Sequence, residues 1–342
     1  MYSYNLQESS PFFSKLPAEL RLEIYEFIFC STCLSFVKQT RDKAKDGSAR
    51  LLPDPNGLSA LRVCRRFNEE IGDRWLGQVL LSFHDPLTVL KKLSALDQQT
   101  LGKLRNLRFW CSTPMVEKKP GAGMRFRLSN FLGMLSGLNL DRLIISGPHR
   151  REYQYLELDA LIRGSNGWKE LYYVSASSEM LGFEKTAVVS LLYSRRTVQR
   201  APQPSTWTEA IAARDGPTAS VTIYRCTDEV LKGSMIYNSL NRQVFTDQVA
   251  KPGRESEYGV ERDTALMAPG ERNKEILVVV KRGKNVDSTE KGNLRILKRY
   301  IINYHTRVMP EERTGPLPRS DDCDLLKYLE PYDDDYLMGS EN

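Results

Sequence analysis

The sequence predicts a fold of the α+β or α/β class, in which helices pack against a sheet. Short apolar runs typical of buried strands alternate with segments whose apolar residues recur at helical spacing. The three clearest strands begin at Leu107, Leu143 and Leu171, at intervals of 36 and 28 residues. A hydrophobic share of 41% and a charged share of 27% are those of an ordinary globular protein, and 342 residues suffice for two domains with cores of their own.

The first element is a short helix predicted over residues 16–29. Pro17 suits the first helical position, where its missing N–H would lack an internal partner, and Glu19 in the first turn opposes the positive helix end. One face carries an apolar residue at every third or fourth position: Leu16, Leu20, Ile24 and Phe27 or Ile28. A short helix with such a stripe has to pack against something, within this chain or on another protein.

The second element is a helix that begins near Ser59, a suitable N-cap. Its apolar residues again recur at helical spacing: Leu61, Cys64, Phe67, Ile71 and Trp75. The segment that separates the two helices, residues 31–57, is polar, rich in Lys and Arg, and closed by Pro-Asp-Pro-Asn-Gly. The chain therefore opens with a helical region that is interrupted by a long polar segment.

These two helices resemble the F-box-like domains of filamentous-fungal proteins, and the resemblance covers residues 12–180. It rests on Leu-Pro-Ala-Glu-Leu-Arg-Leu-Glu-Ile-Tyr from Leu16 and on the Leu, Val-Cys-Arg-Arg-Phe and Trp-Leu elements between Leu58 and Leu76, which stand in F-box order. Cys64 lies 48 positions after Leu16, farther than in a compact F-box. Residues 31–57 are inserted where the middle F-box helix belongs.

The resemblance implies that the helices bind a Skp-type adaptor protein and link an unidentified protein substrate to a cullin ubiquitin ligase. The adaptor-facing residues that it implies are Leu16, Pro17, Leu20, Ile24, Val63, Cys64 and Phe67. The alternative is a scaffold or interaction module in which the same helices form only a core and meet no adaptor. Exposure separates the two: adaptor docking loses its physical basis if Leu20 and Ile24 pack inward against Leu61 and Phe67.

Beyond the second helix, a strand is predicted over residues 78–84 and a helix from Leu87. Four helix-then-strand pairs follow, at residues 101–104 and 107–111, 131–135 and 143–146, 156–162 and 171–174, and 207–213 and 221–225. Such units bury their apolar faces only by stacking side by side with parallel strands. An irregular leucine-rich-repeat-like α/β layer fits this rhythm, and a compact α/β domain fits it nearly as well.

We divide the chain into an N-terminal tail at 1–11, an F-box-like domain at 12–85 with the insertion 31–57, an irregular α/β repeat-like domain at 86–230, a C-terminal α/β extension at 231–310 and an acidic tail at 311–342. Residues 195–217 are predicted to be a linker interrupted by a short helix at Trp207, and residues 242–272 a long surface loop. The last strand is predicted over residues 274–282.

Charge is distributed unevenly along the chain, whose net value is +6. From Arg319 to the end there are eight acidic and two basic residues, so this segment carries −6 and residues 1–318 carry +12. The densest basic stretch, residues 281–307, is predicted to be an amphipathic helix with a solvated basic face, onto which the acidic tail could fold back. Nucleic-acid binding through this stretch is a third and weaker alternative, because the basic residues are dispersed among acids.

The sequence carries no signature of catalysis. It lacks a Gly-x-x-x-x-Gly-Lys-Ser/Thr phosphate loop, a Gly-x-Gly-x-x-Gly after a strand and a Gly-x-Ser-x-Gly elbow. Cys30-Ser-Thr-Cys33 follows the end of a helix, where the dipole disfavours a thiolate, and the other Cys and His residues are scattered singly. We therefore predict a protein that is not an enzyme and holds no cofactor and no metal.

The sequence also predicts an intracellular protein of the cytoplasm or nucleus. No apolar run is long enough to span a bilayer, and the N-terminus has neither the basic region nor the apolar core of a signal peptide. Six cysteines in 342 residues do not make a secreted disulfide framework. We expect no membrane partner and a function in protein–protein interaction.

Overall fold

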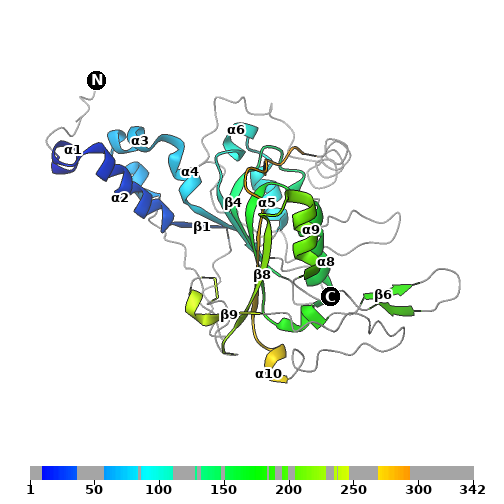
Figure 1. The fold of residues 1–342 in the computed structure, drawn as a ribbon. Helices are drawn as coiled ribbons and strands as arrows, with labels where there is room; N and C mark the ends of the chain where they lie inside the picture. The colour runs from blue at the N-terminus through cyan, green and yellow to red at the C-terminus, as the bar shows by residue number, and fades with distance from the viewer. Residues whose placement is uncertain are drawn as a thin grey trace, which may run out of the picture.

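The centre of the molecule is an eight-stranded mixed sheet in the order β1-β2-β3-β4-β5-β10-β8-β9 (Figure 1). The computed structural model describes residues 10–36, 58–83, 86–110, 128, 132–147, 151–182, 185–188, 195–198, 205–228, 235–236, 238–245 and 269–292. The strands of this sheet are β1 Cys33–Phe36, β2 Leu80–Phe83, β3 Asn106–Trp110, β4 Leu140–Ser146, β5 Trp168–Ser175, β8 Ser220–Cys226, β9 Arg242–Val244 and β10 Ile276–Lys281. Lys185–Val188 (β6) and Arg195–Val198 (β7) form a separate antiparallel pair.

Strands β1 to β5 run parallel, and each lies beside the next one along the chain. Parallel neighbours need a crossover between them, so each connection returns the chain to the start of the next strand. Strand β10 then enters antiparallel between β5 and β8, and β9 closes the far edge against β8. The predicted combination of helices with a sheet is confirmed, and the sheet is of mixed type.

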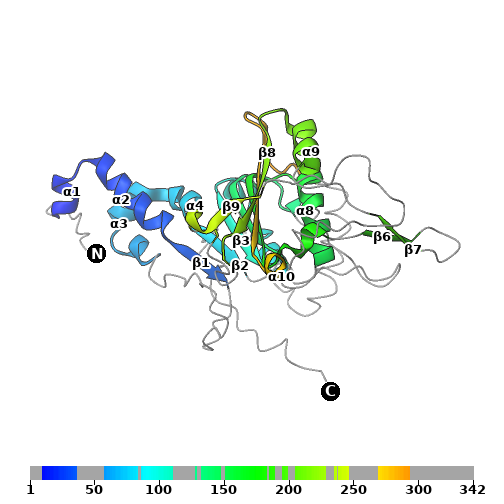
Figure 2. The ribbon, with the colours of Figure 1, turned by 60° about the horizontal axis from the view of Figure 1, so that its bottom comes forward.

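The described helices fall into two groups. Helices α8 and α9 lie side by side on one side of the sheet, and the region from α1 to α4 lies at its β1 edge (Figures 1 and 2). The helical elements are α1 Pro11–Lys15, α2 Ala18–Cys30, η1 Ser59–Arg62, α3 Arg65–Ile71, η2 Gly72–Arg74, α4 Trp75–Gln78, α5 Pro86–Leu93, α6 Gln98–Leu101, α8 Arg151–Gly164, η3 Ser178–Gly182, α9 Ser205–Asp215, η4 Ser239–Asn241 and α10 Pro269–Arg272, where η marks a 3-10 helix.

The main core lies between the sheet and helices α5, α8 and α9. The register aligns Leu107, Leu143, Leu171 and Val280 in one row across four strands, and each of them is completely buried. A strand covered by helices keeps its apolar residues out of water, which is the main force that stabilises such a layer. This row explains why the predicted strands at 107, 143 and 171 read as apolar runs.

Helix α9 corrects the prediction of a linker over residues 195–217. Trp207 is fully buried, its ring lies 5.2 Å from that of Tyr155 on α8, and its indole N–H donates to Asp159 at 3.2 Å. A tryptophan that is buried this completely fixes α9 to α8. The segment is therefore an integral layer of the fold, and the polar residues that suggested a linker flank it.

The segment predicted to be an insertion, residues 31–57, contributes a strand to the sheet, because β1 lies within it and pairs with β2; residues 37–57 lie outside the described residues. The basic helix predicted over 281–307 is wrong for its described part, because residues 282–292 are not helical. They form a strap along the amino ends of β5 and β4, with Gly167 N–H donating to Ser288 O at 2.7 Å and Glu290 N–H to Leu138 O at 2.8 Å.

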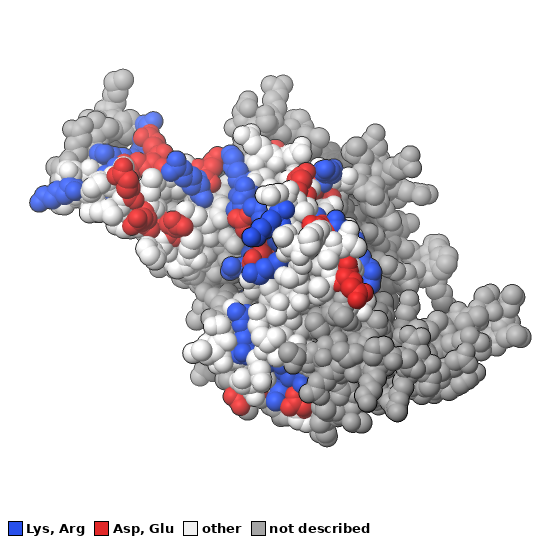
Figure 3. All heavy atoms as spheres, viewed as in Figure 1, with Lys and Arg blue, Asp and Glu red and all other residues white. Residues whose placement is uncertain are grey.

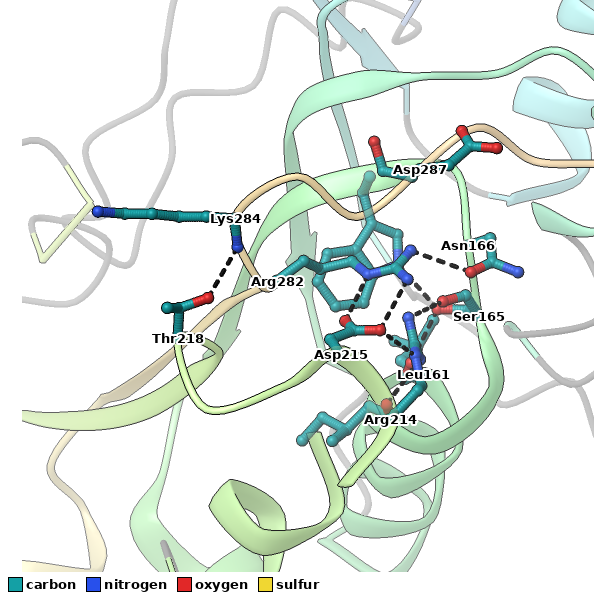
Figure 4. A network of polar contacts seen from close by, with 12 residues as sticks. Leu161, Ser165, Asn166, Arg214, Asp215, Thr218, Arg282, Lys284 and Asp287 are labelled. Atoms are coloured by element: carbon teal, nitrogen blue, oxygen red, sulfur yellow. Dashed lines mark hydrogen bonds and ion pairs between the residues drawn. The ribbon is translucent and has the colours of Figure 1, made fainter. Parts of the chain in front are cut away.

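The strap is anchored by a buried ionic network at the end of α9 (Figure 4). Arg282 donates two hydrogen bonds to the carboxylate of Asp215, from Nε at 2.6 Å and from Nη2 at 2.9 Å, and the two side chains are only 5% and 2% exposed. Arg214 donates to the same carboxylate at 3.1 Å and to the carbonyls of Ile162 and Ser165 at the end of α8. Burial alone would raise the pKa of Asp215, but its hydrogen bonds from Arg282 lower that pKa overall.

Replacing Asp215 with asparagine is expected to destabilise the fold by about 3 kcal/mol, because two largely buried guanidinium groups lose their carboxylate. Urea unfolding followed by circular dichroism measures the change. The matched control is Asp73→Asn, which removes the partner of Lys103 in an exposed pair and should cost less than about 1 kcal/mol. Equal losses in the two variants would contradict the anchoring role of Asp215.

Candidate functional site

The candidate site is a set of exposed apolar side chains on α2. Leu20, Ile24 and Phe27 are 46%, 37% and 78% exposed, and their spacing places them on one arc of the helix, which we call the α2 patch. The side of α2 that faces the molecule instead carries Arg21, Tyr25 and Phe29, which are buried. The predicted stripe therefore points away from the chain's own core, so the condition that would have excluded docking is not met.

The seven predicted adaptor-facing residues do not all lie on the surface. Pro17, Leu20, Ile24 and Val63 are exposed, whereas Leu16 and Cys64 are half-buried. Phe67 is buried and its ring lies 4.4 Å from that of Tyr25, so it supports α2 from within. Phe27 belongs to the exposed patch, and its spacing from Leu20 and Ile24 was the signal that could have added it to the predicted set.

The starts of both helices differ from the prediction. Pro17 is the N-cap of α2, one residue before the first helical position. Ser59 is the first residue of a 3-10 helix whose N-cap is Leu58, whereas Cys64 caps α3 by accepting the N–H of Phe67 at 3.3 Å. Gly72, with a φ of 51°, ends α3, so the predicted continuous helix through Trp75 is broken into short pieces.

A polar cluster between α2 and α3 sets the rotation of α2. Arg21 donates to both carboxylate oxygens of Glu70, at 2.9 Å and 2.8 Å, and Tyr25 donates to Glu70 at 2.9 Å. The third nitrogen of the Arg21 guanidinium, Nη1, donates to the Leu16 carbonyl at 2.5 Å. A planar guanidinium held in this way has little freedom, so the cluster locks the helix with Leu20 and Ile24 outward.

The ionisation of this cluster follows from its geometry. The hydrogen bond with Glu70 raises the pKa of Arg21, while burial followed by the bond to Glu70 raises the pKa of the Tyr25 phenol. Partial burial alone would raise the pKa of Glu70, but hydrogen bonds from Arg21 and Tyr25 lower it overall. At neutral pH the cluster is therefore an ion pair with a neutral phenol. The sequence did not reveal this cluster, because Arg and Glu side chains are usually expected to be exposed to solvent.

Carboxylates border the α2 patch on one side. Glu19, Glu23 and Glu26 are exposed, and each precedes a residue of the patch by one position, about 100° around the helix. Figure 3 shows acidic side chains gathered along this part of the molecule. The site thus offers an apolar strip with a negative rim, which suits a surface that presents apolar residues beside basic ones.

No described residues of this region point to catalysis. Among the residues that the structure describes, no three His, Cys, Asp or Glu side chains lie together as a metal site. Cys30 ends α2 and Cys33 begins β1, and burial raises the pKa of both thiols, so neither is an activated thiolate. None of the described helices is long and apolar enough to cross a membrane.

The Glu70→Gln variant should lose about 2 kcal/mol of unfolding free energy at pH 7, because part-buried Arg21 loses its ionic partner. Folding lowers the pKa of Glu70 below its ordinary 4.5, so the advantage of the wild type is complete above that pH and shrinks as pH falls below it. Urea unfolding at several pH values measures the difference. The neighbouring Glu69→Gln removes a surface pair with Arg65 and should cost about 0.5 kcal/mol or less. An advantage that grows on acidification would refute the assignment.

Comparisons with protein-family models, curated proteins and solved structures find no significant match to this chain.

Proposed function

We propose that this chain is a non-catalytic protein-interaction protein that binds its partner through the α2 patch. The observation that carries the proposal is the exposure of Leu20, Ile24 and Phe27 on a helix whose inner side is already filled by Arg21 and Tyr25. Burying each such side chain in a partner's groove stabilises a complex by about 1.5–3 kcal/mol. An apolar strip on a rigid helix is a common element of helix-in-groove recognition.

In its specific form, the proposal makes the partner a Skp-type adaptor and the chain a substrate-receptor subunit of a cullin ubiquitin ligase in the cytoplasm or nucleus. The F-box-like motif of α2 and α3 supports this form, as does the outward position of Pro17, Leu20, Ile24 and Val63. The repeat-like run of parallel strands β1 to β5 would then present the protein substrate.

The second candidate is an interaction module that meets no adaptor, and β1 favours it. In an F-box the segment after the first helix supplies a middle helix, whereas here residues 33–36 add a strand to the sheet beside β2. A binding surface built around this strand would differ from that of a compact F-box. Both candidates use the α2 patch, and they differ in the partner that it recognises.

Co-purification of the full-length chain with a fungal Skp-type adaptor tests the specific form. We expect capture at about 10 µM and a loss of at least about tenfold in affinity for the double variant Leu20→Asp/Ile24→Asp, because two apolar contacts are replaced by charges. The matched control is Leu22→Asp, since Leu22 is also exposed on α2 but lies on the opposite side from the patch.

Circular dichroism and urea unfolding must first show that both variants stay folded. Equal binding by the wild type and the double variant would remove the α2 patch from the interface. Failure of the wild-type chain to capture the adaptor would reject the ligase form and leave the interaction module, whose partner would be sought with the same pair of variants.

A further inference from the structure

The side of the sheet that faces away from α8 and α9 carries cations beside aromatic rings. The register places Asn106, Arg142, Glu170 and Lys281 in one row across β3, β4, β5 and β10. The next row on the same side contains Arg108, Ile144, Tyr172 and Val279, and Trp110 follows along β3. We call Arg108, Trp110, Arg142, Tyr172 and Lys281 the basic-aromatic face.

The guanidinium groups of this face lie against rings. Arg142 Cζ is 5.1 Å from the centre of the Tyr172 ring, and Arg108 Cζ is 5.5 Å from that of Trp110. A cation–π contact holds a guanidinium in place and leaves its N–H groups able to donate hydrogen bonds to a carboxylate. Arg142 is exposed and therefore presents such donors at the surface of the sheet, whereas Arg108 is buried and supports Trp110 from below.

Positive charge exceeds negative charge within this face. Lys281 lies 3.4 Å from Glu170, which also accepts a hydrogen bond from the Tyr172 hydroxyl at 3.0 Å, so one carboxylate stands against the two exposed cations Arg142 and Lys281. Lys281, Arg142 and Trp110 are exposed. The fitting ligand is an extended acidic segment with aromatic residues, because carboxylates match the donor forks and rings stack beside Tyr172 and Trp110.

The chain itself contains such a segment. Residues 319–342 hold eight acidic and two basic residues, and Glu330-Pro-Tyr-Asp-Asp-Asp-Tyr336 combines carboxylates with two tyrosines. The strap brings the chain to the amino end of β4, the end at which Arg142 lies, because Ser136 Oγ donates to Lys291 O at 3.4 Å just before β4 begins. The 26 residues from 293 to 318 reach at most about 90 Å when fully extended, so the length of chain that follows the strap permits the acidic segment to reach this face.

We propose that residues 319–342 dock on the basic-aromatic face of their own chain, so that an acidic segment of another protein has to displace them. The contact is largely electrostatic, and salt weakens it. It is independent of the α2 patch, which lies at the β1 edge of the molecule.

Zero-length carbodiimide cross-linking of the full-length chain, followed by mass spectrometry, tests the proposal. We expect amide bonds between Lys281 and carboxylates of residues 321–335, with a yield that falls at about 0.5 M salt. Glu170 competes for the same ammonium group, so Glu170→Gln should raise the yield of tail cross-links. The matched control is Lys284, which is also exposed but lies three residues farther along the chain, beside Thr218 (Figure 4); it should form fewer cross-links to the tail than Lys281.

A competition experiment provides the second measurement. A fluorescent peptide of residues 319–342 should bind a full-length variant with its eight acidic tail residues neutralised at least about tenfold more tightly than it binds wild type, whose own tail competes. Adding Arg142→Glu/Lys281→Glu should abolish this binding, and adding Lys284→Glu should not. Equal cross-linking of Lys281 and Lys284 would overturn the proposal. So would cross-links that, in a mixture of light and heavy isotope-labelled protein, join only two different molecules. Equal peptide binding by the wild type and the neutralised variant would also overturn it.

Discussion

The orientation of the N-terminal helical region depends on the Arg21–Glu70 ion pair. Both side chains are largely withdrawn from water, and a buried guanidinium that lost its carboxylate would be strongly destabilising. Turning α2 so that Leu20 and Ile24 faced the core would expose Arg21 and leave Glu70 without its bidentate donor. The exposed apolar patch is thus the geometric consequence of a polar interior contact.

Local sequence patterns sufficed for elements whose burial is uniform. Strands β3, β4 and β5 bury Leu107, Leu143 and Leu171 completely on the side that the helices cover, so their apolar runs were visible without knowledge of the fold. The position of β10 between β5 and β8 was not predictable in the same way, because strand order is decided by contacts between residues that lie about 50 to 110 positions apart in the sequence. The helix predicted where the strap lies was wrong for a similar reason, since the hydrogen-bond partners of the strap, such as Leu138 and Gly167, lie just before β4 and β5.

At the candidate site, periodicity found the stripe but did not fix its direction. From the sequence, Leu20 and Ile24 fitted both a surface that binds an adaptor and an inward face, because apolar residues usually point inward; in the structure Arg21 and Tyr25 occupy the inward position. The decisive partner, Glu70, lies 49 residues beyond Arg21 and is indistinguishable in sequence from its exposed neighbour Glu69. For the same reason Phe67 was predicted to face the adaptor but is buried, because it packs against Tyr25 on the side of α2 that faces inward.

The connection between α2 and the sheet fixes the orientation of the candidate site relative to the sheet. Ser31 and Thr32 alone separate the helix from β1, and both are held by hydrogen bonds. Ser31 Oγ donates to Ile28 O at 2.9 Å, Thr32 Oγ1 donates to the same oxygen at 2.7 Å, and Leu80 N–H donates to Thr32 O at 3.0 Å. The rings of Phe36 and Phe83 then stack at 4.3 Å across β1 and β2. A helix joined to a sheet by so short a link cannot swing independently, so a partner bound at the α2 patch, as proposed, would be held in a fixed direction relative to strands β3 to β5. For the proposed receptor, such a rigid joint would matter as much as affinity, because orientation limits which groups can meet.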